Sequence, residues 1–149
     1  GTLRRHVKRL LLPGQSRLHF SKEGTRHRRQ IASALVELGV DVSIFVCRAD
    51  LGRNEADMRR LCLAAIVSDL QARGEPVSLI LESGHHQDPE DYPVIASARR
   101  RQPPLSYEHV DGDHEPLLWL PDSFAWLWGA GGEWQRRIVP AVAAAIEIG

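Results

Sequence analysis

Three segments typical of β-strands alternate with segments of helical periodicity, and this alternation constrains the fold more than any other feature of the sequence. The first strand segment, residues 40–47, is rich in β-branched residues and ends in a continuous apolar run, as strands buried on both faces do. The other two are residues 77–81, followed directly by Glu82, and residues 105–110. Strands that alternate with helices favour a mainly parallel sheet flanked by helices, in which the carboxyl ends of the strands meet at one edge.

Helices are predicted from apolar residues at helical spacing and from the Gly and Pro residues that end them. The predicted helices cover residues 3–12, 25–38, 55–73, 88–101, 117–128 and 133–148. Thr25, Asn54 and Asp88 are the predicted caps of the second, third and fourth of these helices. Residues 17–20 are predicted to form a further short strand. The sequence has no internal repeat and no low-complexity linker. We therefore expect residues 1–149 to form a single α/β domain, with residues 1–30 as a basic N-terminal arm and residues 31–149 as the core.

The composition is that of a folded globular domain. Hydrophobic residues make up 43% of the 149 residues and charged residues 26%, which argues against a disordered or fibrous chain. No apolar stretch approaches the roughly 20 residues needed to span a bilayer, so we expect no membrane partner. Cys47 and Cys62 lie in apolar surroundings without a Cys-x-x-Cys spacing, which predicts buried thiols and a cytoplasmic protein. The first residues contain neither a secretory segment nor an initiator Met, and we expect a cut or processed N-terminus.

The net charge of zero hides an uneven distribution of charge. Residues 1–30 contain nine basic side chains against Glu23 alone, whereas residues 82–122 contain nine acidic side chains against three arginines. A metal-dependent nuclease could use both, because cations bind phosphates and carboxylates bind metal ions. The alternative is that the two regions attract each other or a partner protein, and charge alone leaves both open. The candidate phosphate-binding residues are Arg4, Arg5, Arg9, Arg26, Arg28 and Arg29.

Two carboxylates are the strongest candidates for metal ligands. Glu82 follows a predicted core strand directly, so its carboxylate is held on fixed backbone and can still reach solvent. The alternative is an exposed glutamate that only ends the strand. Asp122 is the one charge in the apolar stretch 117–126, where a buried carboxylate needs a partner or an ion. The alternative is an acid that stabilises a helix N-terminus, which Pro121 favours.

Other polar groups are weaker candidates. The loop after Glu82 contains His85, His86, Asp88, Glu90 and Asp91, which suit metal binding by type but lack a zinc-like spacing. Asp91 has the most weight among them, because it lies close to Glu82 in the chain and could enter the same site. The acidic segment 111–115 reads as a solvated turn, with Glu115 as an outside candidate for a ligand. Trp119, Trp126 and Trp128 could stack on bases, but their helical spacing among apolar residues is more typical of a core.

Several common catalytic motifs are absent from the sequence. No Gly-x-x-x-x-Gly-Lys loop is present, and no Gly-x-Gly-x-x-Gly follows a strand, so nucleoside triphosphatase and dinucleotide-binding functions have no support. No Gly-x-Ser-x-Gly segment indicates a serine hydrolase, and neither cysteine has a catalytic context.

Three segments together resemble a large bacterial family of proteins of unknown function. They are His19-Phe20-Ser21-Lys22-Glu23 with the arginines at 26–29, residues 77–83, and above all Glu115-Pro116-Leu117-Leu118-Trp119-Leu120-Pro121-Asp122. The resemblance, which runs from about Leu3 to Trp128, implies a ribonuclease H-like fold and a carboxylate site for one or two divalent ions, Mg²⁺ or Mn²⁺. It places Glu82 at the middle-strand acid, Asp122 at the last-helix acid and Asp91 at a further acid after the middle strand.

The family resemblance also marks what this sequence lacks. Related sequences open with a strand that ends in Asp-Glu-Ser and supplies the first acid, and no such strand precedes residue 3 here. We therefore expect an incomplete metal site, an uncovered sheet edge and self-association through that edge as a homodimer. The favoured hypothesis is a nuclease-like domain that cleaves phosphodiesters with Glu82 and Asp122 sharing an ion. The alternatives are a non-catalytic nucleic-acid-binding module and a regulatory protein–protein interaction module.

Overall fold

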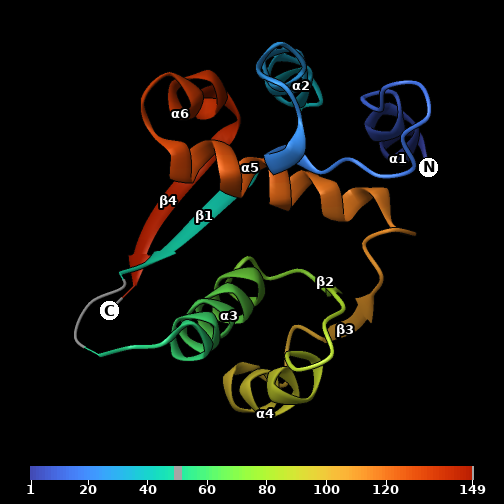
Figure 1. Cartoon of the computed structure of the whole chain (residues 1–149). Helices are drawn as coiled ribbons and strands as arrows, with labels where there is room; N and C mark the ends of the chain where they lie inside the picture. The colour runs from blue at the N-terminus through green and yellow to red at the C-terminus, as the bar shows by residue number, and fades with distance from the viewer. Residues whose placement is uncertain (49–51, 149) are drawn as a thin grey trace. The chain divides into compact units, whose positions relative to one another are not determined.

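The computed structural model describes residues 1–48 and 52–148, and the chain forms two compact units. Unit 1 comprises Gly1–Ile44 and Asp111–Ala144, and unit 2 comprises Phe45–Val110 and Ala145–Gly149. The chain passes from one unit to the other after Ile44, after Val110 and after Ala144. The first of these points lies within β1 (Val42–Cys47) and the last within β4 (Val142–Ile148), and these two strands form a two-stranded sheet (Figure 1). The single domain that the sequence predicts stays a prediction, because two compact units can belong to one domain.

Unit 1 is helical. Its elements are α1 (Thr2–Lys8), η1 (Phe20–Lys22), α2 (Thr25–Glu37), η2 (Pro116–Leu118), α5 (Trp119–Ala130), α6 (Gly132–Ile138) and η3 (Val139–Ala141). Its core contains Phe20, Ile31, Trp119 and Phe124, each at most 2% exposed. Val7 of α1 is completely buried in the same core, so the basic N-terminal segment is packed into unit 1.

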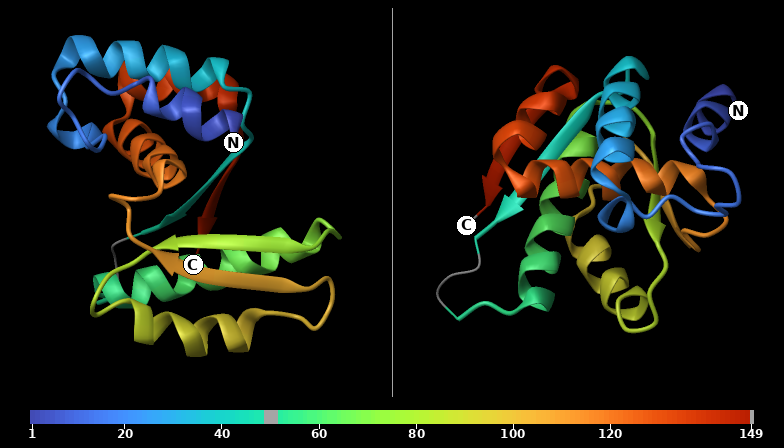
Figure 2. Two further views of the ribbon diagram at one scale, coloured as in Figure 1. Left: turned by 90° about the vertical axis from the view of Figure 1, so that its right-hand side faces the viewer. Right: turned by 45° about the horizontal axis from the view of Figure 1, so that its top comes forward.

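Unit 2 is a βαβ unit with an additional helix. α3 (Glu55–Ala72) is followed by β2 (Val77–Glu82), α4 (Asp88–Ala98) and β3 (Leu105–Val110). β2 and β3 pair in parallel, in a register that runs from Val77 opposite Leu105 to Glu82 opposite Val110. Both helices cover one face of this pair, as the left view of Figure 2 shows. The apolar side chains between the helices and the strands include Leu63, Val67, Ile95 and Leu105.

Local sequence explains how α3 begins and how its end is fixed. The Asn54 side chain accepts a hydrogen bond from the Asp57 backbone N–H, and the Asp57 side chain accepts one from the Asn54 N–H, which completes a capping box. Asn54 was predicted as the cap, and this is confirmed. In the last turn, the buried Gln71 amide donates to the carbonyl oxygens of Arg100 and Pro103 and accepts from the Arg100 N–H. These bonds tie α3 to the loop before β3.

Three expectations about the fold are corrected. The predicted helix over 133–148 is α6 followed by η3 and β4, because Pro140 has no N–H for a helix interior and residues 142–148 alternate in burial with the period of a strand. The predicted strand over 17–20 is absent, and the 3₁₀ turn η1 begins at Phe20. The strands form two two-stranded sheets, β1–β4 and β2–β3, and not one continuous sheet.

The class of the fold and most element types agree with the sequence. An α/β fold with a parallel β2–β3 pair is confirmed, whereas the ribonuclease H-like topology stays a prediction. The helix predicted over 3–12 is shorter, ending at Lys8, and the one predicted over 88–101 ends at Ala98. None of the described helices combines the length and the apolar character that crossing a membrane requires. Cys47 and Cys62 are free and half-buried, and the predicted cytoplasmic location stays a prediction.

Candidate metal site

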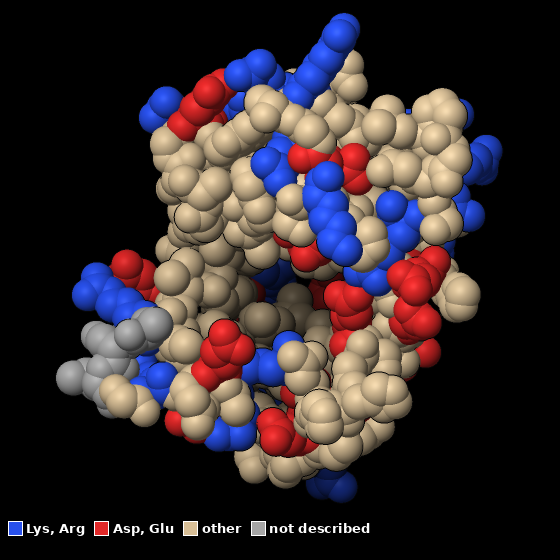
Figure 3. Space-filling model, in the orientation of Figure 1, with Lys and Arg blue, Asp and Glu red and all other residues tan. Residues whose placement is uncertain are grey.

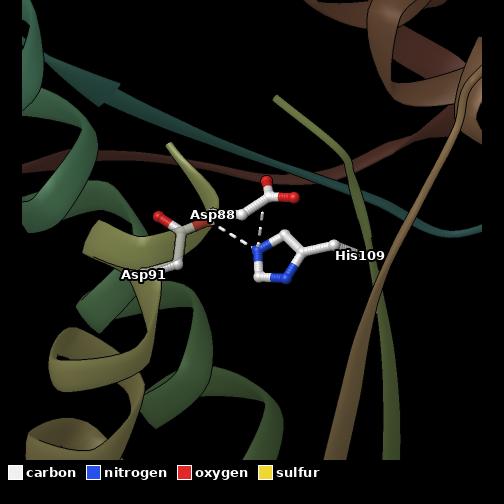
Figure 4. A group of neighbouring side chains, drawn as sticks. All are labelled: Asp88, Asp91 and His109. Atoms are coloured by element: carbon white, nitrogen blue, oxygen red, sulfur yellow. Dashed lines mark hydrogen bonds and ion pairs between the residues drawn. The ribbon is translucent and has the colours of Figure 1, made fainter. Parts of the chain in front are cut away.

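Asp88, Asp91 and His109 of unit 2 bring three ligand-type side chains together (Figure 4). Asp88 and Asp91 lie in the first turn of α4, three residues apart, and side chains at this spacing share one face of a helix. His109 is the penultimate residue of β3. It lies opposite Leu81 of β2, so its side chain is on the face of the strand pair that α3 and α4 cover. The fold therefore brings the carboxyl end of β3 to the N-terminus of α4.

The distances within this group suit a common ligand. His109 Nε2 lies 3.0 Å from Asp91 Oδ2 and 3.7 Å from Asp88 Oδ1, and one ligand atom from each of the three residues lies within 4.8 Å of the others. Asp91 and His109 have side chains only 3% and 7% exposed, whereas 23% of the Asp88 side chain is exposed. The group is thus open to solvent on the Asp88 side. It could hold a metal ion.

Backbone and hydroxyl donors hold the Asp88 carboxylate in place. Oδ1 accepts a hydrogen bond of 2.8 Å from the Gly84 N–H, and Oδ2 accepts one of 2.7 Å from the Ser83 hydroxyl. The hydrogen bonds from Gly84 and then Ser83 are the main causes that lower the pKa of Asp88. Burial opposes them, and the charges of His109 and Arg59 make smaller contributions that also lower this pKa. Asp88 was predicted as the cap of α4. It is instead the first helical residue, and its carboxylate bonds back to the loop after β2.

Arg59 of α3 forms an ion pair with the buried carboxylate of Asp91. Its Nη2 lies 2.8 Å from Asp91 Oδ2, and its Nε donates to Asp91 Oδ1 over 3.3 Å. Asp91 Oδ2 therefore receives both Arg59 and His109. Because an ionised carboxylate only accepts hydrogen bonds, His109 donates from Nε2 in this arrangement, and it could bind an ion through the same nitrogen only in the tautomer that carries the proton on Nδ1.

Two tyrosines fix the position of the imidazole. The rings of Tyr92 and Tyr107 lie 5.6 Å and 6.2 Å from the His109 ring, both edge-on. They also lie 5.8 Å from each other. Aromatic contacts at these distances are favourable and restrict rotation of the ring. His109 is thus oriented by its neighbours before any ligand binds.

The carboxylates that the sequence pointed to lie on three different elements. Asp91 belongs to the group described above. Glu82 is the last residue of β2 and is exposed, and because successive side chains of a strand alternate, it faces away from the side that carries His109 and Leu81. Asp122 belongs to unit 1, where it lies exposed in the first turn of α5 and interacts favourably with the positive end of that helix. An ion shared by Glu82 and Asp122 stays a prediction.

The candidate phosphate-binding arginines fall into two groups. Arg4 donates to both oxygens of the buried Glu115 carboxylate, over 2.7–3.1 Å, so Glu115 is the partner of an arginine and not a solvated acid. Arg28 donates from Nε to the Phe20 carbonyl and packs on Trp126. The remaining four, all exposed on α1, the residue after it, or α2, are Arg5, Arg9, Arg26 and Arg29.

Sequence reasoning does not identify His109 or Arg59, and it gives Asp88 only as one of the weaker candidates in the loop after Glu82. The spacing of Asp88 and Asp91 in one helical turn was a usable signal, as was the position of His109 at the carboxyl end of a parallel strand. No feature of the sequence identifies Arg59, because only the packing of α3 against α4 brings it close to Asp91.

Comparison of the chain with known proteins finds no relative. No family model, curated protein or solved structure matches the chain. The resemblance to the ribonuclease H-like family therefore stays a prediction, and the candidate site depends on the arrangement of its own side chains.

Proposed function

We propose that the protein is a divalent-metal-dependent nuclease whose metal ion is bound by Asp88, Asp91 and His109. The observation that carries this proposal is that one ligand atom from each of these residues lies within 4.8 Å of the other two. Two carboxylates and an imidazole on rigid elements are a donor set that divalent metal ions accept. Three protein ligands also leave coordination positions for water and substrate.

The donor set favours Mn²⁺ over Mg²⁺. Mg²⁺ prefers oxygen ligands and keeps several waters, whereas an imidazole nitrogen suits a transition metal better. His109 would supply that nitrogen, and Asp88 and Asp91 would supply the oxygens. When bound, the ion would lower the pKa of a coordinated water and polarise a phosphodiester oxygen, which are the two requirements of metal-assisted hydrolysis.

The neighbouring residues prepare the site for this role. Asp88 is held ionised by its bonds to Gly84 and Ser83, so it offers a carboxylate at neutral pH. Arg59 neutralises Asp91 in the free protein and lowers the cost of burying that carboxylate. Arg59 would have to give up Asp91 Oδ2 for that oxygen to hold an ion, and its guanidinium could then bind a phosphate group.

The family resemblance implies a different ligand set for the same activity, Glu82 and Asp122 with Asp91 as a further acid. If Asp88, Asp91 and His109 hold the ion, His109→Gln abolishes metal-dependent cleavage, and Glu82→Gln and Asp122→Asn retain it. If Glu82 and Asp122 share the ion, these three results are reversed. Asp91→Asn abolishes cleavage in the first arrangement and does not distinguish it from the second, because Asp91 belongs to both.

The test measures cleavage of fluorescently labelled single-stranded RNA and DNA by the full chain with Mn²⁺, with Mg²⁺ and with EDTA. We expect cleavage with Mn²⁺, slower cleavage with Mg²⁺ and none with EDTA. Glu90→Gln is the matched control, because Glu90 is an exposed acid of the same helical turn. Equal cleavage by wild type, Asp91→Asn and His109→Gln would exclude this site. Metal binding without cleavage of any nucleic acid would exclude the nuclease activity and favour a non-catalytic module.

A further inference from the structure

A second surface, in unit 1, carries aromatic and guanidinium groups that the metal site does not use. The Arg28 Cζ lies 4.2 Å from the centre of the Trp126 ring, and the Trp126 ring lies 5.8 Å from that of Trp134 in an edge-on arrangement. The Arg137 Cζ lies 5.9 Å from the centre of the Trp134 ring. α2, α5 and α6 thus present two cations and two indoles in one row. We call these four residues the Arg–Trp face.

Trp126 and Trp134 pack against the core of unit 1 but are less buried than Trp119. Trp119 is 2% exposed, and its Nε1 donates a 2.7 Å hydrogen bond to the Gly112 carbonyl, as expected for a core residue. Trp126, Trp134, Arg28 and Arg137 are only half-buried. Packing in the hydrophobic core explains the burial of Trp119. It does not explain why two arginines lie against the partly exposed rings of Trp126 and Trp134.

The Arg28 guanidinium is fixed in orientation. Its Nε donates to the Phe20 carbonyl over 3.0 Å, and its Nη2 donates to the Ser21 carbonyl. Its plane is also held by Trp126, which itself lies 5.2 Å from the Phe20 ring. A guanidinium that backbone carbonyls hold in place has already lost its rotational freedom, so a flat ligand can stack on it at low entropic cost.

The surface around the Arg–Trp face is cationic. Its exposed basic residues include Arg29 of α2 and Arg136 of α6. Figure 3 shows basic side chains gathered over α2 and α6. Glu133 at the start of α6 is bonded to Arg137, and Arg137, Arg29 and Arg136 together lower the pKa of Glu133, which shows that these cations lie near one another. Glu23 is buried and bonded to His27, so it does not offset this charge at the surface.

From this surface we propose that the Arg–Trp face binds single-stranded nucleic acid. Bases stack on Trp134 and on the Arg28–Trp126 pair, and phosphates contact the neighbouring Arg29 and Arg136. Every base has a π face, so stacking of this kind tolerates any sequence, while the cations follow the backbone. Duplexes keep their bases inside the helix and offer this face only phosphates.

For the proposed nuclease, this binding identifies single-stranded nucleic acid as the substrate class. That assignment rests on the proposed function. The binding itself needs no divalent ion, so it is measured separately from cleavage. The probes are fluorescently labelled dT20 and U20, a 20-base-pair duplex and a poly-glutamate peptide, each titrated with the full chain in EDTA while anisotropy is recorded. We expect both single strands to bind at least tenfold more tightly than the duplex, and the peptide to bind weakly.

Matched substitutions locate the binding. Arg29→Ala with Arg136→Ala removes two cations next to the face, and Arg100→Ala with Arg101→Ala removes two exposed cations of unit 2. We expect only the first pair to weaken binding tenfold or more. That pair should also make the plot of log affinity against log salt less steep by about 1.4, since each phosphate contact on a single strand contributes about 0.7.

Substitution of the indole tests stacking. Trp134→Ala should weaken binding about tenfold, whereas Trp134→Phe, which keeps an aromatic face, should bind nearly as well as wild type. Circular dichroism of both variants checks that unit 1 is folded. Equal losses in the two arginine pairs, duplex binding as tight as single-strand binding, tight binding of poly-glutamate, or no effect of Trp134→Ala would each overturn the proposal. Loss of cleavage in Asp91→Asn with unchanged dT20 binding would separate this face from the metal site.

Discussion

Replacing Arg59 by methionine tests the competition between the protein's own cation and a metal ion. Methionine keeps the unbranched apolar stem of arginine and removes only the guanidinium. In Arg59→Met, the Asp91 carboxylate is left with His109 as its partner. We therefore expect the variant to be less stable than wild type without metal, and to bind Mn²⁺ more tightly because no guanidinium has to be displaced.

The size of the effect follows from the geometry of the pair. Arg59 reaches Asp91 at 2.8 Å, Asp91 is 3% exposed and Arg59 is 36% exposed. A hydrogen bond to a buried charge contributes about 1.5–3 kcal/mol, whereas an exposed ion pair contributes about 0–1 kcal/mol. A half-exposed arginine on a buried carboxylate falls between these limits, at about 2 kcal/mol. If Mn²⁺ has to displace Arg59, the loss of that competition corresponds to a roughly 30-fold lower Kd.

The assay is urea unfolding followed by circular dichroism, with and without Mn²⁺, together with calorimetric titration of Mn²⁺. In EDTA, Arg59→Met should lose about 2 kcal/mol of the free energy of unfolding. At a Mn²⁺ concentration of about 100 times its Kd, it should regain about 2.7 kcal/mol. Arg60→Met is the matched control, because the neighbouring Arg60 contacts the exposed Glu90 at 3.8 Å and the half-buried Asp57.

Two results would refute this reasoning. Equal stability of Arg59→Met and Arg60→Met in EDTA would show that the Arg59–Asp91 pair contributes nothing. An unchanged Kd for Mn²⁺ in Arg59→Met would show that the ion does not bind at Asp91.

Three further substitutions test the contacts that support the two units. In unit 1, hydrogen bonds from Arg4 lower the pKa of Glu115, so this pair stabilises the folded state above the ordinary glutamate pKa of 4.5, and its contribution is lost as pH falls through the lowered pKa. Glu115→Gln should therefore be less stable than wild type at pH 7 and lose less stability on acidification. Identical pH profiles of the two proteins in chemical unfolding would contradict this. In unit 2, Gln71→Leu leaves one N–H and two carbonyl groups of the loop before β3 without their partner, and we expect the free energy of unfolding in urea to fall by about 3 kcal/mol. A decrease below about 1 kcal/mol would show that water replaces the Gln71 amide. Asn54→Ala removes the capping box of α3 and should cost about 1 kcal/mol, with Asn54→Asp near wild type, whereas equal losses in both would exclude a capping role.

Local chemistry accounts for the elements that the sequence predicts well. Asn54 and Asp57 mark the start of α3, and apolar residues before Glu82 mark β2. The end of the chain was mispredicted because its alanines favour helix and three of them stand together at 143–145. Pairing with β1 overrides that propensity, and Pro140 was the local signal of the break. Pairing partners are set by tertiary packing, so two separate sheets could not be deduced from alternation alone.

The candidate site shows the same division between local and long-range information. Asp91 is predicted because it lies near a strand end, and its spacing from Asp88 in one helical turn would have given Asp88 the same weight. His109 becomes a ligand candidate only when β3 pairs with β2 in a register that brings it beside α4. Glu82 and Asp122 were selected as lone carboxylates next to apolar residues, yet both are exposed and so need no ion to offset burial.

The most direct test of the metal site is Mn²⁺ binding to the full chain, followed by electron paramagnetic resonance and by calorimetry. We predict one Mn²⁺ ion per chain, because Asp88, Asp91 and His109 form one group of ligand atoms. Asp91→Asn and His109→Gln should abolish binding, and Glu90→Gln should leave the Kd unchanged. Binding of Mn²⁺ that survives in both Asp91→Asn and His109→Gln, or the absence of binding in wild type, would contradict the account.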